Sequence, residues 1–169
     1  GFAGDVTRTW PVSGKYDAAQ KAIYEVVLQS QLDAIGITIP GTGYRDIHMK
    51  ACMTLTEGLV DLGILKGSPE DLVAEDVHAL FFPHGVGHII GLDVHDMEDL
   101  GDRAGYAPGR TRSERFGLCY LRLDRDLEPG MAVTIEPGFY QVPAILKVPE
   151  RVGKAKDVIQ WSELEKYSH

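Results

Sequence analysis

Three of the six histidines in this 169-residue chain lie within one short segment, residues 82–96. His84, His88 and His95 stand there with two carboxylates, Asp93 and Asp96. The prolines and glycines of the segment disfavour a helix, and in an extended backbone His84 and His88 point to the same face. Such imidazoles can serve as a metal ligand and as a substrate-facing acid or base. The alternative is a loop whose histidines form only local hydrogen bonds, but the clustering favours a chemical site.

The order of the motifs along the chain resembles that of one enzyme family. His84-Gly-Val-Gly-His88, followed by Gly91-Leu-Asp-Val-His95-Asp96, is similar to the signature of the prolidase and aminopeptidase P family of pita-bread metallopeptidases. Residues 4–12 upstream and residues 127–140 downstream match further family motifs, and the resemblance spans about residues 1–146. It implies an α+β fold in which helices cover a bent, mostly antiparallel sheet, here incomplete at both ends.

The resemblance also implies a ligand set for divalent metal ions. Asp5 is expected to bridge two cations through its two carboxylate oxygens, and His88 is the expected imidazole ligand for Mn, Zn or Co. Glu136 follows the apolar run 131–135, and a buried carboxylate there needs a partner such as a metal. Glu136 is also the expected proton acceptor for a metal-bound water.

His84 and His95 match the two family histidines that face the substrate and do not bind metal. They are expected to donate hydrogen bonds to the scissile carbonyl and to the oxyanion that develops on it. The expected catalytic residues are therefore His84, His95 and Glu136. Spacing alone would equally allow His84 and His88 to be the ligand pair, whereas no His-Glu-x-x-His helix supports a zincin.

Arg122 lies fourteen residues before Glu136, where prolidases carry an arginine that binds the C-terminal carboxylate of a dipeptide. A planar guanidinium suits that bidentate contact. The alternative is a solvated arginine, because Asp124, Arg125 and Asp126 follow closely. With His84 and His95, Arg122 completes the predicted substrate-binding set.

The resemblance predicts metal-dependent hydrolysis of the Xaa-Pro bond, most directly of dipeptides. One alternative is an Xaa-Pro aminopeptidase that acts on longer peptides. Another is a metal-free pita-bread module that only binds peptides or proteins. A third is a different enzyme on the same fold, such as a methionine aminopeptidase or a creatinase-like amidinohydrolase.

Composition limits the partners and the compartment. The net charge of −8 argues against a nucleic-acid partner, and no apolar run reaches the ~20 residues that span a bilayer. No signal peptide opens the chain. Cys52 and Cys119 do not make a disulfide framework and indicate reduced thiols in a cytoplasmic protein.

Compared with the family, residues 1–169 correspond to part of the C-terminal catalytic domain, without the N-terminal domain. Five protein ligands are expected for two metal ions, and only Asp5, His88 and Glu136 match. We therefore expect metal binding by this chain alone to be weak or absent. The whole protein is expected to form a homodimer and to bind proline-containing dipeptides or short peptides.

Local patterns predict the elements that position these residues. Helices are expected over residues 16–34 and 44–65, the second with Gly67 just past its end. Ser68 and Pro69 are expected to cap and open a short helix that reaches about residue 76. Strands are expected over residues 5–13, 131–135 and 138–142, and residues 101–113 are expected to form an exposed loop.

Overall fold

A computed structural model describes residues 1–168; residue 169, the last of the predicted domain, lies outside the described residues. The first helix, α1, runs over Ala18–Gly36. Asp17 caps its start, because the Asp17 carboxylate accepts the N–H of Gln20 at 2.8 Å and the Gln20 side chain accepts the N–H of Asp17 at 3.1 Å. The predicted first helix is confirmed, with its start shifted by two residues.

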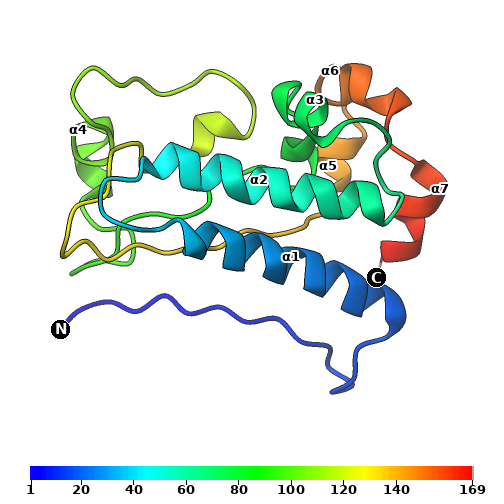
Figure 1. Cartoon of the computed structure of the whole chain (residues 1–169), viewed down its shortest axis with the longest axis horizontal. Coiled ribbons are helices and arrows are strands. Elements are labelled where there is room, and N and C mark those ends of the chain that lie inside the picture. Colours follow the sequence, from blue (N-terminus) through cyan, green and yellow to red (C-terminus); the bar gives the residue numbers. More distant parts are fainter. Residues whose placement is uncertain (169) are drawn as a thin grey trace.

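Helix α2 (Tyr44–Asp61) packs antiparallel to α1 and forms a hairpin with it (Figure 1). The Ser30 hydroxyl donates to the Ala51 carbonyl at 2.8 Å across the two helices. A Cβ atom at Gly58 would lie only 2.5 Å from a methyl group of Val26, so Gly58 lets the two backbones approach closely.

Helix α2 ends earlier than the sequence pattern predicted. Its last helical residue is Asp61, and Gly63 follows with φ +71°, a left-handed conformation that glycine adopts without strain. The Gly63 N–H donates to the Val60 carbonyl and closes the helix end. The predicted end near Leu65 was wrong, because Gly63 rather than Gly67 stops the helix.

Most other elements are single turns of helix. The Ser68 hydroxyl accepts the N–H of Asp71, which confirms the predicted cap of the short helix that follows. These elements, seen above and to either side of the hairpin in Figure 1, are α3 (Pro69–Ala74), η1 (Val77–Leu80), η2 (Glu98–Leu100), α4 (Asp102–Gly105), η3 (Leu118–Tyr120), α5 (Pro143–Leu146), α6 (Pro149–Val152), η4 (Gly153–Asp157), α7 (Trp161–Leu164) and η5 (Glu165–Tyr167). The expected loop at 101–113 thus begins with α4.

The predicted antiparallel sheet is not formed in residues 1–168, where the β-structure consists of isolated bridges. Segments 86–90 and 132–136 do run antiparallel in one register, with the N–H groups of Glu136, Thr134 and Ile90 bonded to the carbonyls of Val86, His88 and Ala132 at 2.7–3.1 Å. The hydrogen bonds that would run in the opposite direction between the same residues are replaced by bonds to side chains. The His88 N–H donates to the Thr134 hydroxyl, and the Thr134 carbonyl accepts the Tyr44 hydroxyl at 2.6 Å.

The strands expected over residues 5–13 and 138–142 were also wrong. Residues 5–11 form no regular element, residues 12–13 are part of a turn, and most of these residues are exposed. A backbone hydrogen bond joins this end of the chain to the histidine segment, from the Ala3 N–H to the Gly91 carbonyl at 2.9 Å. Strand-forming residue types alone do not make a ladder without a neighbouring backbone to accept their hydrogen bonds.

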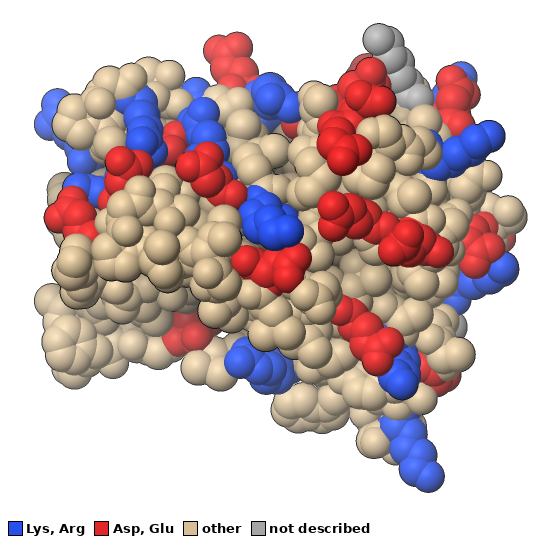
Figure 2. Space-filling model, in the orientation of Figure 1, with Lys and Arg blue, Asp and Glu red and all other residues tan. Residues whose placement is uncertain are grey.

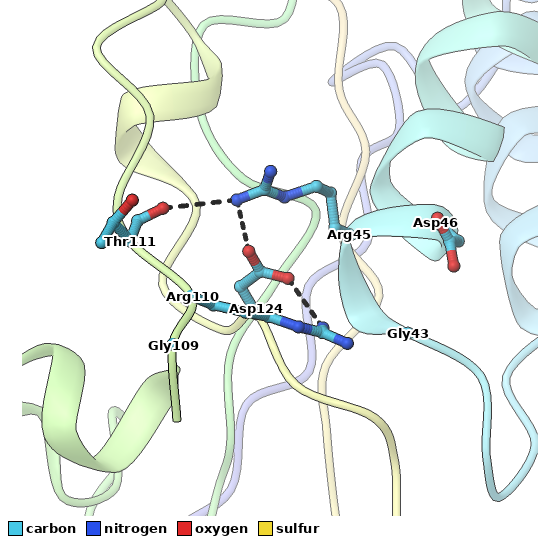
Figure 3. Close-up of a pocket in the computed structure, with 7 residues that line it drawn as sticks. All are labelled: Gly43, Arg45, Asp46, Gly109, Arg110, Thr111 and Asp124. Carbon is cyan, nitrogen blue, oxygen red and sulfur yellow. Dashed lines mark hydrogen bonds and ion pairs between the residues drawn. The ribbon is translucent and has the colours of Figure 1, made fainter. Parts of the chain in front are cut away.

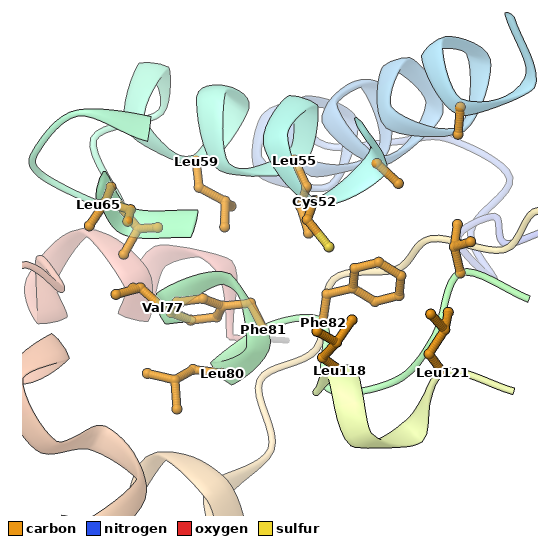
Figure 4. Close-up of a cluster of buried hydrophobic side chains, with 14 of the residues drawn as sticks. Cys52, Leu55, Leu59, Leu65, Val77, Leu80, Phe81, Phe82, Leu118 and Leu121 are labelled. Atoms are coloured by element: carbon orange, nitrogen blue, oxygen red, sulfur yellow. The ribbon is translucent and has the colours of Figure 1, made fainter. Parts of the chain in front are cut away.

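The hydrophobic core lies between α2 and the segments that follow it (Figure 4). Phe81 stacks on Phe139 with ring centroids 5.6 Å apart, which ties the start of the histidine segment to the downstream motif. Fully or almost fully buried apolar side chains of this core include Tyr44, Ile47, Cys52, Leu55, Leu59, Ile64, Leu80, Phe81, Phe82, Leu121 and Leu123.

On the molecular face drawn in Figure 2, acidic and basic side chains are interspersed over the surface. None of the helices within residues 1–168 combines the length and the apolar character needed to cross a bilayer. This face therefore adds no evidence for a nucleic-acid partner.

Candidate metal centre

Two glycines allow the histidine segment to lie close against its neighbours. A Cβ atom at Gly85 would approach the Leu121 Cα to 2.8 Å, and one at Gly87 would approach the Thr134 carbonyl oxygen to 2.2 Å. Real side chains do not tolerate such contacts, so glycine is required at both positions. The glycines that interrupt the histidines thus serve a packing role that brings His88 beside the downstream motif.

Three predicted ligands converge at this point. The Nε2 atom of His88 lies 3.2 Å from an Asp5 oxygen and 3.1 Å from a Glu136 oxygen, and the candidate ligand atoms all lie within 4.8 Å of one another. The His88 side chain is 6% exposed, Asp5 24% and Glu136 41%. The site is therefore closed on the His88 side and open on the Glu136 side.

The hydrogen bonds of His88 show that this arrangement fits a cation. Its Nδ1 atom lies 2.9 Å from the Ile89 carbonyl oxygen, which can only accept, so we assign the ring proton to Nδ1. The Nε2 atom then faces two carboxylate oxygens, Asp5 at 3.2 Å and Glu136 at 3.1 Å. A positive charge between these atoms stabilises the arrangement, carried either by a proton on Nε2 or by a metal cation. A backbone carbonyl that orients the non-ligating nitrogen is typical of metal-binding histidines.

Thr134 and Gln31 hold the acidic arm of the site in place, and neither was predicted. The Thr134 hydroxyl donates to the Glu136 carboxylate at 2.6 Å while it accepts the His88 N–H at 3.0 Å. Gln31, on α1, donates to the Ile135 carbonyl at 2.8 Å. In an extended segment Thr134 shares a face with Glu136, two residues on, and that spacing was the available signal.

His95 lies against His88, with ring centroids 4.3 Å apart and the rings nearly perpendicular. The His95 Nδ1 atom lies 3.2 Å from an Arg122 guanidinium nitrogen. Burial and the nearby charges of Arg122 and His88 lower the pKa of His95. His95 thus contacts the ring of His88 and the guanidinium of Arg122.

Glu98 is a further residue of this group that the sequence analysis missed. One of its oxygens lies 2.8 Å from His95 Nδ1, and the other pairs with the Arg122 guanidinium. The His95-x-x-Glu98 spacing was the available signal. Arg122 is 41% exposed, and because Glu98 occupies part of its fork, Arg122 is not a fully free carboxylate receptor.

His84 lies beside Tyr140 and outside the ligand cluster of described residues. Its Nδ1 atom is 2.8 Å from the Gly85 carbonyl oxygen, and its Nε2 atom is 3.1 Å from the Tyr140 hydroxyl. The ring therefore has its proton on Nδ1 and accepts from Tyr140. Burial and the Glu136 charge raise the pKa of Tyr140. The geometry favours His88 over a His84–His88 ligand pair.

A cavity of about 380 Å³ lies elsewhere, between the start of α2 and the loop 109–111 (Figure 3). Its floor is Asp124, which is 1% exposed and pairs with Arg110 at 3.0 Å and with Arg45 on the other side. Both arginines are thus engaged in ion pairs, so this cavity is a structural junction between α2 and the segment around Asp124.

The two other acidic residues of the histidine segment form a turn. The Asp96 carboxylate accepts the N–H of Asp93 at 3.2 Å, and it sits against Gly91, where a Cβ atom would be 2.6 Å from it. Neither carboxylate joins the cluster of Asp5, His88 and Glu136.

Two carboxylates and one imidazole on glycine-rich extended segments, beside a helical hairpin, define a centre of the kind that binds divalent cations. The model of metallopeptidase family M24 matches residues 1–163, and the chain belongs to that family. The family predicted from the motif order is confirmed.

The relatives include both kinds of Xaa-Pro peptidase. The chain is 42% identical over 145 residues to the human Xaa-Pro dipeptidase, covering 86% of the chain and 28% of that protein. It is 41% identical over 151 residues to the Xaa-Pro aminopeptidase of Escherichia coli K12, covering 89% of the chain and 30% of that protein. The chain thus spans less than a third of the length of either relative.

Solved structures of aminopeptidase P share the fold. The chain matches the zinc-substituted Escherichia coli aminopeptidase P in complex with product with a TM-score of 0.68 and 39% identity, over 89% of the chain and 30% of that structure. It matches the Pseudomonas aeruginosa aminopeptidase PepP with the same TM-score and 37% identity, over 87% of the chain and 29% of that structure. The family fold is supported, and only its sheet is not found in residues 1–168.

Proposed function

We propose that this chain is part of a dinuclear metallopeptidase that hydrolyses Xaa-Pro peptide bonds. The observation that carries the proposal is the convergence of His88 Nε2 with an Asp5 oxygen at 3.2 Å and a Glu136 oxygen at 3.1 Å. The relatives, named Xaa-Pro dipeptidase and Xaa-Pro aminopeptidase, support the substrate class.

In this proposal Asp5, His88 and Glu136 hold divalent cations such as Mn, Zn or Co. Bound there, the cations would supply a water molecule of lowered pKa. Glu136 accepts the proton of the attacking water, and the Thr134 hydroxyl keeps the Glu136 carboxylate oriented. Because only three of the five ligands expected for the family are present, we expect the chain alone to bind metal weakly and to hydrolyse slowly.

His95 and His84 contact the substrate. His95 donates a hydrogen bond to the scissile carbonyl and to the oxyanion that forms from it. His84 reaches the substrate through Nε2, the atom to which the Tyr140 hydroxyl now donates. A substrate amide N–H can replace that hydroxyl, because both are donors.

Metal titration and peptide hydrolysis by the chain test the proposal together. We expect weak Mn binding, slow release of proline from an Xaa-Pro dipeptide with excess Mn, and no release from His88→Ala or Glu136→Gln. Asp93→Asn, a change of a carboxylate outside the cluster, is the matched control and retains activity. Sub-micromolar two-site metal binding by the verified chain would contradict the expected incompleteness. Peptide binding without hydrolysis would favour the metal-free module, and creatine turnover would favour an amidinohydrolase.

A second candidate, an aminopeptidase for longer peptides, is favoured by the Glu98–Arg122 pair. A dipeptide carboxylate can reach Arg122 only in competition with Glu98, whereas a longer peptide has no carboxylate at that point. If Arg122 binds the dipeptide, Arg122→Ala should raise KM for dipeptides by about tenfold or more and leave longer peptides little changed. Arg122→Lys should restore part of the affinity, because it keeps the charge and loses the fork. Equal losses for both lengths would favour the aminopeptidase.

The cytoplasmic location and the homodimer of the whole protein stay predictions. Cell fractionation checks the first, and sedimentation velocity checks the second.

A further inference from the structure

A second group of metal-ligating side chains lies in the hydrophobic core and shares no residue with the Asp5–His88–Glu136 cluster. It consists of His48 and Cys52 on α2 and His78 on η1. The three residues are at most 3% exposed, and one candidate ligand atom from each lies within 4.8 Å of the others.

Local structure holds these three side chains together. His48 and Cys52 are one helical turn apart, so they lie on the same face of α2, and the Cys52 Sγ atom is 3.5 Å from His48 Nε2. Asp76, whose backbone is left-handed with φ 58°, lies directly before η1, the element that carries His78. Two hydrogen bonds of 2.7 Å from Arg115 hold the Asp76 carboxylate in place.

The group is incomplete as a hydrogen-bonded network. His78 Nδ1 is buried and has no hydrogen-bond partner among the described residues. Burial lowers the pKa of His48 to about 3 and that of His78 to about 4, so both rings are neutral at pH 7. A buried polar nitrogen without a partner is uncommon in folded proteins. Two neutral imidazoles and a thiol, one of them unsatisfied, are the donors that a soft cation uses.

We propose that His48, Cys52 and His78 bind one soft monovalent cation, Cu(I), in a three-coordinate site. With metal–ligand bonds of about 2.0–2.3 Å, two ligands of one ion stand about 3.5 Å apart, as Cys52 Sγ and His48 Nε2 do. On binding, the Cys52 thiol loses its proton to solvent, and the sulfur–copper bond forms without any change of oxidation state.

Charge balance selects the monovalent ion. A Cys52 thiolate and Cu(I) sum to zero, and two neutral imidazoles leave the unit uncharged in a core where Cys52 points toward Phe82 (Figure 4). Zn²⁺ would leave one uncompensated positive charge, which is costly in an apolar interior, and structural zinc takes four protein ligands. Thiolate and imidazole both suit copper.

Transfer of Cu(I) from a coloured chelator to the reduced chain, under argon, tests the site. We expect the wild-type chain to remove one equivalent from the Cu(I)–bathocuproine disulfonate complex, and its X-ray absorption spectrum to show one sulfur and two nitrogen neighbours. No transfer, or stoichiometric Zn²⁺ uptake in place of Cu(I), overturns the proposal without any mutant.

Two substitutions and two controls locate the site. Cys52→Ser and His78→Gln should lose the transfer, whereas Cys119→Ser, which removes the other thiol, and His88→Ala, which removes a ligand of the first cluster, should retain it. Far-UV circular dichroism shows whether each variant is folded, and Cys52→Ala replaces Cys52→Ser if the latter is not. Transfer that survives without Cys52, or that disappears with Cys119, refutes the site.

Discussion

Thr134 offers the sharpest test of how the first cluster is held, because one hydroxyl serves both Glu136 and His88. Thr134→Val keeps the shape of the side chain and removes a hydrogen bond to the Glu136 carboxylate. The loss of that bond should destabilise the fold by about 1.5 kcal/mol, the low end of the range for bonds to charged groups, because Glu136 is 41% exposed. The substitution also leaves the His88 N–H without its acceptor, about 1 kcal/mol more. We expect the free energy of unfolding to fall by about 2 to 3 kcal/mol. The Mn dissociation constant should rise about 10- to 100-fold, as for other groups that orient metal ligands.

Electron paramagnetic resonance of free Mn²⁺ measures this weak binding, and urea unfolding measures the stability. Thr134→Ser keeps the hydroxyl and should bind Mn nearly as the wild type does. Thr56→Val is the matched control: it also loses a buried hydroxyl, which donates to the Cys52 carbonyl at 2.7 Å, but it lies on α2 away from Glu136. It should change stability and leave Mn affinity unchanged. Unchanged Mn affinity in a folded Thr134→Val chain would refute the role of Thr134.

Three further predictions concern stability. Asp124→Asn should lower the free energy of unfolding in urea by about 2 to 3 kcal/mol, less than the ~3–5 kcal/mol of a fully buried pair, because its arginine partners reach water. Asp126→Asn, at an exposed carboxylate, should lower it by under about 1 kcal/mol. Equal losses for the two variants would contradict the buried junction. Gly87→Ala should lower both the thermal unfolding midpoint and the Mn affinity, because the alanine Cβ atom would clash with the Thr134 carbonyl oxygen. If neither quantity changed, segments 86–90 and 132–136 would be able to separate freely. Because the pKa values of His48 and His78 are depressed in the folded chain, the unfolded chain binds more protons below pH 6.5. Each histidine should therefore lower the free energy of unfolding by about 1.4 kcal/mol per pH unit as the pH falls from 6.5 toward about 4. A free energy of unfolding that does not change between pH 6.5 and 5 would contradict the burial of neutral rings.

The helices were predictable because their signals are local. Ser68 followed by Pro69 marks a helix start by chemistry that acts within one turn, and the Asp17-x-x-Gln20 capping box was equally readable although it was not used. The end of α2 was misplaced because two glycines, Gly63 and Gly67, could each close a helix. Which of these two glycines ends the helix depends on tertiary packing, which the sequence pattern does not show.

The sheet was mispredicted because strand pairing also depends on side chains that compete for the backbone hydrogen bonds, and some of these lie far away in sequence. The segment 132–136 has the residue types of a strand. However, the Tyr44 hydroxyl donates to the Thr134 carbonyl, and the Thr134 hydroxyl accepts the His88 N–H. Tyr44 lies 90 residues away in sequence, so the pattern of the segment itself does not show this competition.

The sequence by itself determined the family and the candidate ligands Asp5, His88 and Glu136, because the order and spacing of motifs survive without coordinates. Tertiary structure alone decided which atoms face one another: His88 Nε2 and the oxygens of Asp5 and Glu136, the Thr134 hydroxyl and Glu136, and Glu98 with His95 and Arg122. The physical reason is the range of the interactions. Caps and turns form between residues a few positions apart, whereas a site forms where separate segments meet, and hydrogen-bond geometry there depends on ångström-scale packing that a linear pattern does not encode.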